Sequence, residues 1–444
     1  MKLKETIYPK ILFGCWLVFA LLLTQTSSVY AIGAVWILTG GLGMCLTRKI
    51  VLPDKLQLLW MLFSVFALVS TIMGFLCYSG VYNYSRSIFL LTVVFTSLLP
   101  LPMANFLKGK DLCEKFFSLY RNFMLLCSCL GLFEFITKKQ VYMKLIHSAD
   151  ILRNFETMGD ITLKEYRTML FFMHPIHYSM LLLCGGIALY YMPYKFKILN
   201  IAAYLLFFLN IVFTQSRTSW ILAIVAVLMI FSKKKIKQKK TFDISLKKIL
   251  ISIGIIILIA VVIILFMVLP VFEEAREIIL KRTINNDSKS PYGARLSNLS
   301  ILGQIYQRYG LRFFFFGGGN GFAICYLRVH PTMSGWVKAI DNQFLTVMID
   351  FGIFGFCTFM TFFGYAFYLF YKNDIQTRDI SYIILFLILF SGFSYEVIGI
   401  NTVYLLFSVV LSQLNQKQPS KLEDSIRKYF VQKGDKKHCR KLEL

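Results

Sequence analysis

Long apolar runs alternate with short polar segments along most of the chain. The runs are about 17–25 residues long, the length that an α-helix needs to cross the hydrocarbon core of a bilayer. The pattern predicts an all-α polytopic membrane protein with about 12 transmembrane helices. The predicted spans are residues 8–24, 29–47, 56–77, 85–107, 116–137, 167–192, 197–214, 218–233, 249–270, 342–371, 379–395 and 398–414.

The segments between the spans are of two kinds, which alternate along the chain. One kind is rich in lysine, as in the run SKKKIKQKK that starts at Ser232. The other kind, where it is short, is nearly free of lysine and arginine, as in residues 24–28, 78–84 and 394–399. Because positive residues mark cytoplasmic loops, the lysine-rich segments are predicted to be cytoplasmic, and both termini with them.

The two longest segments on the predicted outer side divide the chain into regions. Residues 1–270 hold nine transmembrane helices and an outer loop at 137–166, residues 271–341 form a long, mainly helical outer lid, and residues 342–415 hold the last three helices. The remaining residues, 416–444, form a basic cytoplasmic tail. The cytoplasmic side has no room for a nucleotide-sugar-binding or ATPase domain, so any chemistry is expected at the outer face and must draw on a bond in the substrate.

Composition agrees with a membrane protein. The chain is 57% hydrophobic and only 16% charged, whereas soluble proteins are about a quarter charged. The net charge of +25 comes mostly from short loops and the tail, which favours membrane topology over nucleic acid as its explanation. The ten cysteines form neither a disulfide framework nor a CxxC metal pattern.

Lysine and arginine are distributed differently between the two sides. The predicted inner side carries 26 lysines and 5 arginines, while the outer side carries 7 lysines and 10 arginines. The guanidinium fork suits bidentate binding of phosphate, so these arginines indicate an anionic ligand such as a lipid pyrophosphate, although for any single residue an ordinary surface role is equally plausible. The outer arginines are Arg86, Arg153, Arg167, Arg217, Arg276, Arg282, Arg295, Arg308, Arg312 and Arg328.

Arg217 is the outer arginine with the most specific setting. It follows the seventh span in the sequence FTQSRTSWI, in a turn so short that the position of the side chain is restricted. A charge at this depth is costly unless it is paired or faces water. A functional role is favoured over an arginine that merely extends to the membrane surface.

The tenth span, AIDNQFLTVMIDFGIFG, contributes two carboxylates. Asp341 lies at its outer end, where it and Asn342 could also act as a simple N-cap. Asp350 lies roughly 13 Å deeper and therefore needs a partner or water. Gly352 and Gly355 are expected to permit close helix packing.

Two further groups of residues are candidates for ligand contacts. His174 and His177 are three residues apart on one predicted helix face, with Pro175 kinking the helix between them; residues lining a cavity are favoured over a zinc site. The glycine sequence GGGNG, which contains Asn320, could form a backbone nest for an anion, but a plain turn is favoured. No metal and no cofactor are predicted.

These motifs, in this order, resemble those of the O-antigen ligase/O-antigen polymerase superfamily. The resemblance covers roughly residues 160–370. It rests on a serine–arginine pair at a span end, a glycine turn after a long outer loop, and an acidic–asparagine pair followed by a deeper carboxylate and two glycines. The corresponding residues are Ser216-Arg217, Gly317 to Phe322, Asp341-Asn342, Asp350, Gly352 and Gly355.

The resemblance implies work on undecaprenyl-pyrophosphate-linked sugars at the outer face of the bacterial plasma membrane. It implies that arginines bind the pyrophosphate. By position, Arg217 matches the family's turn arginine, and Arg295 in the long outer loop corresponds to a second one. Ligases of the family have histidine where this chain has Asp341, so the resemblance favours the polymerase branch.

The resulting hypothesis is a metal-independent polysaccharide polymerase that joins lipid-linked repeat units. Asp341 is its general base, and Arg217 and Arg295 stabilise the leaving group. A ligase acting on a terminal acceptor and a transporter of lipid-linked oligosaccharide are the alternatives. The expected partners are the lipid-linked glycan and membrane lipid, with a chain-length regulator and a flippase as further candidates. The substrate-binding candidates are Arg167, His174, His177, Arg86, Asn320 and Asn342.

Overall fold

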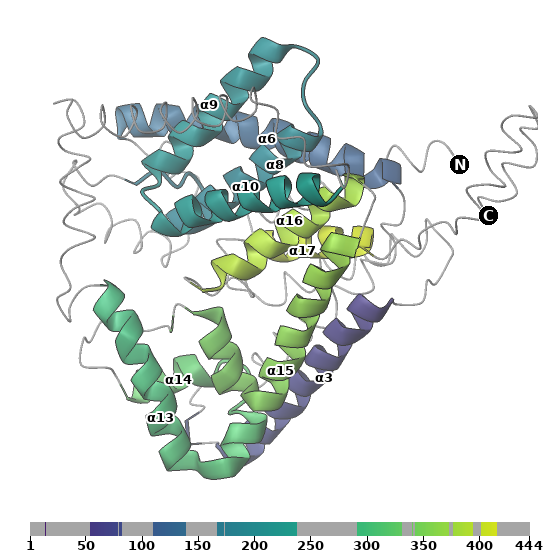
Figure 1. Ribbon diagram of the computed structural model, residues 1–444. Helices are drawn as coiled ribbons and strands as arrows, with labels where there is room; N and C mark the ends of the chain where they lie inside the picture. Colours follow the sequence, from purple (N-terminus) through teal and green to yellow (C-terminus); the bar gives the residue numbers. More distant parts are fainter. Residues whose placement is uncertain are drawn as a thin grey trace, which may run out of the picture.

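The computed structural model describes residues 14, 54–78, 80–81, 110–138, 167–172, 174–237, 291–330, 340, 342–372, 376–393 and 401–414. All regular structure in this part of the chain is helical (Figure 1), which confirms the predicted all-α fold. The helices are α3 (Lys55–Cys77), α6 (Lys110–Thr137), α8 (Pro175–Tyr191), α9 (Lys197–Phe213), α10 (Arg217–Lys237), α13 (Pro291–Phe316), α14 (Phe322–Val329), α15 (Gln343–Lys372), α16 (Gln376–Ser391) and α17 (Asn401–Leu414).

Three of the described helices are long and apolar enough to cross a bilayer. They are α3, residues Glu114–Thr137 of α6, and α15, and α9 is a shorter apolar helix. The chain is therefore a helical polytopic membrane protein, while the number of twelve spans stays a prediction. The predicted spans 29–47, 85–107 and 249–270, and all but one residue of 8–24, lie outside the described residues, as do nearly all of the outer loop 137–166, residues 271–290 of the lid and the tail.

The helices form two packed groups (Figure 1). In one group α8 contacts α6, α9, α10 and α16, and α17 packs on α16. In the other group α15 runs along α3, and α13 and α14 pack at one end of this pair. Aromatic packing joins α17 to the second group. The ring centroid of Trp60 in α3 lies 5.1 Å from that of Phe362 in α15 and 4.8 Å from that of Phe407 in α17. The segment with α13 and α14, residues 291–330, is called the outer segment below.

One predicted span is wrong in its outer part. Residues 167–192 were expected to form a single helix kinked at Pro175, but α8 begins at Pro175. Proline is well suited to the first turn of a helix, where its missing N–H group is not needed, and His174 caps this end. Residues 167–172 are not helical, and Leu170 has a φ of 50°.

The helix α15 is interrupted at Gly352, where φ is 64° and ψ is −170°. The break releases carbonyl groups that an intact helix would bond four residues onward. The glycine turn of the outer segment occupies two of them: the amide of Gly318 donates to Ile349 at 3.0 Å, and the amide of Gly319 donates to Asp350 at 2.7 Å. The predicted close approach at Gly352 is thus confirmed, and its neighbours are Phe315 at the end of α13 and Gly317 of the glycine turn.

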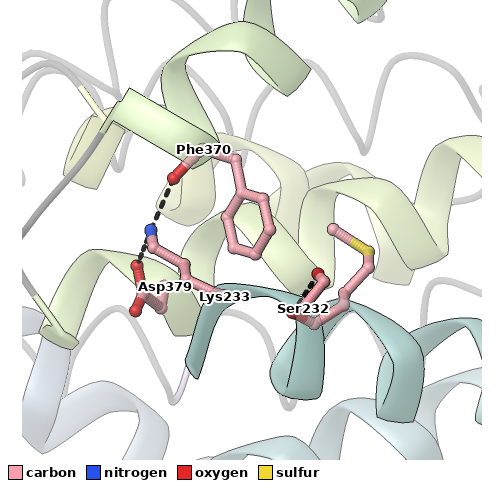
Figure 2. A network of polar contacts seen from close by, with 5 residues as sticks. Ser232, Lys233, Phe370 and Asp379 are labelled. Atoms are coloured by element: carbon pink, nitrogen blue, oxygen red, sulfur yellow. Dashed lines mark hydrogen bonds and ion pairs between the residues drawn. The ribbon is translucent and has the colours of Figure 1, made fainter. Parts of the chain in front are cut away.

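The ends of α10, α15 and α16 that are predicted to face the cytoplasm are joined by a buried cation. Lys233 of α10 donates to the carbonyl of Phe370 near the end of α15 and forms an ion pair with Asp379 in the first turn of α16 (Figure 2). The side chains of Lys233 and Asp379 are only 7% and 6% exposed. Both charges also suit the helix ends they occupy, since cations favour C-termini and carboxylates favour N-termini.

Removing one partner of this ion pair is expected to destabilise the protein strongly. Asp379→Ala should cost about 3–5 kcal/mol, because it leaves the Lys233 ammonium buried without its counter-charge. The double variant Lys233→Met, Asp379→Leu should recover most of the loss. Thermal unfolding of the detergent-solubilised protein, followed by size-exclusion chromatography, measures both effects. A single variant as stable as wild type would contradict the expected role.

Candidate functional site

The turn that carries Arg217 has the predicted form. The helix α9 ends at Phe213 and α10 begins at Arg217 itself, so only residues 214–216 connect them. Gln215 takes a left-handed conformation with φ 50°, which reverses the chain within this short distance. The Arg217 side chain is exposed, and its backbone is held by the two helices that the turn connects.

Buried hydroxyl groups hold the turn against α8. The Ser219 hydroxyl lies 2.9 Å from that of Ser216, and it also hydrogen-bonds the hydroxyl of Ser179 in α8. All three serines are buried. Ser216, which belongs to the predicted serine–arginine pair, therefore has a structural role that joins α10 to α8 beside Arg217.

Arg167 lies at the same turn. Its Nε donates to the carbonyl of Thr214 at 2.9 Å, and the amide of Thr168 donates to the carbonyl of Phe213 at 3.2 Å. Arg167 is 47 residues from Thr214 in sequence. The structure thus places Arg167 against the turn that leads into Arg217, so two of the arginines that the sequence singled out meet the same turn.

The two predicted histidines are neighbours at the start of α8, but only His177 lies within the helix. His174 precedes the helix as its N-cap, and its Nδ1 accepts from the amide of Ile176 at 3.1 Å. The ring of His177 lies in the first turn, is only 4% exposed, and has its centroid 5.8 Å from that of His174. Among the described residues, no group of three His, Cys, Asp or Glu could hold a metal ion.

The glycine turn binds the carboxylate of Asp350, a residue of the same chain. Asp350 is 3% exposed, and its two oxygens accept from the amide of Gly321 at 2.8 Å and from the amide of Ala323 at 2.9 Å. These amides open α14, where a negative charge is favoured. Asp350 therefore has the partner that its depth required, and the plain turn that the sequence favoured is in fact a nest for an internal anion.

Both candidate asparagines take part in hydrogen bonds that fix the backbone. The backbone N–H of Asn320 donates to the side-chain hydroxyl of Thr71 at 3.0 Å, which fastens the glycine turn to α3. The side chain of Asn342 accepts from the amides of Phe344 and Leu345 at 3.0 and 3.1 Å. Asn342 is thus the predicted N-cap of α15.

Three predicted site residues lie wholly or partly outside the part of the chain that the structure describes. Asp341 and Arg86 are not among the described residues, and for Arg295 only the helical backbone of α13 is described. Asp341 stands directly between two described residues, the buried Ile340 and the capping Asn342.

The outer segment offers no activated thiol. Burial raises the pKa of the Cys325 thiol in α14; Arg328 opposes the rise and Asp350 adds to it. The thiol stays protonated at neutral pH, and because the thiolate is the nucleophilic form, Cys325 is unsuited to covalent catalysis.

Glu134 is a residue of this region that the sequence did not single out. It lies near the end of α6, is 2% exposed, and accepts from the amides of Met169 at 3.3 Å and Leu170 at 3.0 Å. A carboxylate inside an apolar span, here in GLFEFIT, is the signal that could have identified it, since such a group needs a partner.

Comparison with known families gives a match within the chain. The family model described as O-Antigen ligase matches residues 202–360, from within α9 to within α15. The matched part contains the turn with Arg217, the glycine turn, Asp341 and Asp350, whereas Arg167 and the histidines precede it. No curated protein matches the chain. Residues 202–360 are thus similar to an O-antigen ligase domain, and this match supports the O-antigen ligase/polymerase superfamily for the chain.

Proposed function

We propose that the protein is a polysaccharide polymerase, which joins undecaprenyl-pyrophosphate-linked oligosaccharide repeat units at the outer face of the bacterial plasma membrane. The family supports the coarser statement that the chain is a membrane glycosyltransferase of the O-antigen ligase/polymerase type acting on a lipid-linked glycan. The observation that carries the proposal furthest is the placement of Arg167 and Arg217 at one turn. Two guanidinium groups there suit the two phosphates of a pyrophosphate.

The proposed reaction is a direct displacement at the anomeric carbon. A hydroxyl oxygen of one repeat unit forms the new glycosidic bond, while the bond from the anomeric carbon to the pyrophosphate oxygen breaks. The undecaprenyl pyrophosphate leaves with the electron pair, and the hydroxyl proton passes to Asp341 as general base. Arg217 and Arg295, with Arg167 and Arg86, stabilise the charge that gathers on the leaving group. Inversion of the anomeric centre is expected.

The other carboxylates of this region are poor candidates for the base. Glu134 and Asp350 are each buried and each accept hydrogen bonds from two backbone amides. These amides occupy the carboxylate oxygens, which are therefore poorly placed to take a proton from an acceptor hydroxyl. This supports Asp341 for proton transfer, with the neighbouring Asn342 cap holding the start of α15.

Two features favour polymerisation over the alternatives. An aspartate at position 341, where ligases of the family have histidine, supports the polymerase branch. Broken helices are typical of transporters, in which the freed carbonyls bind ions; the break in α15 is different, because Gly318 and Gly319 occupy the carbonyls of Ile349 and Asp350. The proposal includes a chain-length regulator and a flippase as partners, and both termini in the cytoplasm.

The size profile of the surface glycan tests the proposal. We expect deletion of the gene to reduce the long ladder to a single repeat still attached to its normal acceptor, and Asp341→Asn to do the same. Gel electrophoresis of surface glycan from wild type, deletion and Asp341→Asn strains measures this.

Two other outcomes would overturn the proposal. Long glycan that stays on its lipid carrier and never reaches the acceptor would identify a ligase. An unchanged profile, combined with movement of unaltered lipid-linked oligosaccharide across liposome membranes by the purified protein, would identify a transporter.

A further inference from the structure

We propose that Glu134 is a positioning residue, which sets Arg167 for pyrophosphate binding by holding residues 167–172 in place. These residues are called the strap. The inference rests on the proposed function, because it takes Arg167 as a pyrophosphate ligand. Glu134 lies outside the residues that the family model matches and is absent from the proposed reaction.

Glu134 attaches the strap to α6. One carboxylate oxygen accepts from the amide of Met169 at 3.3 Å and the other accepts from the amide of Leu170 at 3.0 Å. Met169 and Leu170 are each 1% exposed. Buried amides without acceptors are costly, so the carboxylate stabilises the non-helical backbone of the strap.

The strap is attached to the Arg217 turn at its other end. The amide of Thr168 and the Nε of Arg167 donate to two successive carbonyls, those of Phe213 and Thr214. The direction of the strap therefore decides where the Arg167 guanidinium lies relative to Arg217. Only one residue, Thr168, lies between Arg167 and Met169, whose amide is the first that Glu134 binds.

A carboxylate meets the demands of this position better than other side chains. Both of its oxygens accept, and its charge shortens and strengthens bonds to N–H donors. A glutamine would turn an NH2 group toward one of the two amides. Leu170 also holds a left-handed φ of 50°, a conformation that persists in a non-glycine residue only where the surroundings fix it.

Glu134 acts on the substrate through Arg167. At 2% exposure, with both oxygens engaged by amides, its carboxylate is enclosed by the strap. Losing the carboxylate should release the strap and let Arg167 move away from the Arg217 turn. Binding of pyrophosphate should weaken, while steps that do not involve Arg167 stay the same.

Competition by inorganic pyrophosphate provides the test. The full-length protein in nanodiscs is assayed with a lipid-linked repeat unit, and the inhibition constant of inorganic pyrophosphate is measured for Glu134→Gln, Arg167→Gln and the double variant. We expect each single variant to raise the constant about tenfold, the value of one charge-assisted hydrogen bond. The double variant should be no worse than Arg167→Gln, because the two residues act as one unit.

Two further variants complete the test. Glu134→Asp keeps the charge but is shorter, so it should restore part of the affinity. Ser128→Ala is the matched control: its buried hydroxyl lies on the same helix and donates to Met124 of α6, so the inhibition constant should not change.

The outcomes separate this inference from the proposed function. If Arg167→Gln raises the inhibition constant and Glu134→Gln does not, the positioning role is wrong and the pyrophosphate site stands. Effects that multiply in the double variant would likewise contradict positioning through Arg167. If neither Arg167→Gln nor Arg217→Gln changes pyrophosphate inhibition, the proposed site itself is wrong.

Discussion

Replacing Arg217 with alanine is expected to lower glycan elongation by about a hundredfold to a thousandfold, the usual effect of removing one charge-stabilising donor from an active site. The expectation follows from the three-residue connection between α9 and α10, which leaves the side chain exposed but its backbone fixed. Incorporation of labelled lipid-linked repeat units by the purified protein measures the rate.

Two variants show whether the loss comes from the guanidinium. Arg217→Lys keeps a positive charge but loses the planar fork, so its rate should lie between wild type and alanine. Thr218→Ala, one residue along the same helix, should elongate normally. Elongation by Arg217→Ala at the wild-type rate would remove Arg217 from the reaction.

Replacing Gly352 with alanine is expected to detach the outer segment from α15. A Cβ atom at this position would lie 2.6 Å from the amide nitrogen of Gly317 and closer still to the carbonyl of Phe315. The left-handed φ of 64° adds roughly 1–2 kcal/mol for a non-glycine residue, and overpacking adds about 1–3 kcal/mol. Limited proteolysis from the outer side should then cleave residues 291–330 much faster than in wild type.

A second glycine of the same helix supplies the control. A Cβ atom at Gly364 would meet no other atom within 4 Å, so Gly364→Ala should leave protease resistance unchanged and gain up to about 1 kcal/mol in helix propensity. Equal resistance of Gly352→Ala and Gly364→Ala would show that the contact with Gly317 does not hold the outer segment.

The parts of the structure that depend on local pattern could be predicted from the sequence. The apolar run 56–77 gives α3 within one residue, because hydrophobic length decides where a membrane helix ends. The turn with Arg217 and the Asn342 cap were also predicted, since both depend on residues within a few positions of each other.

The parts that depend on distant backbone contacts could not be predicted. The break in α15 is stabilised by a turn about thirty residues earlier, and no periodic pattern marks that contact. The start of α8 was missed because a proline within an apolar run can either kink a helix or begin one, and the choice lies with the His174 cap and the strap. The contact of Glu134 with the strap, and that of Arg167 with the Arg217 turn, likewise join residues that are far apart in the sequence.

The order in which the chain is synthesised gives the Asp350 contact a role in membrane insertion. A carboxylate in the middle of a span costs about 2.5–3.5 kcal/mol on insertion scales. The amides that bind Asp350 belong to Gly321 and Ala323, and the turn they lie in rests on Thr71 of α3. All of these residues leave the ribosome before α15, so the acceptor site for the carboxylate can form first. The span that carries Asp350 then enters the bilayer beside a partner that already compensates its charge.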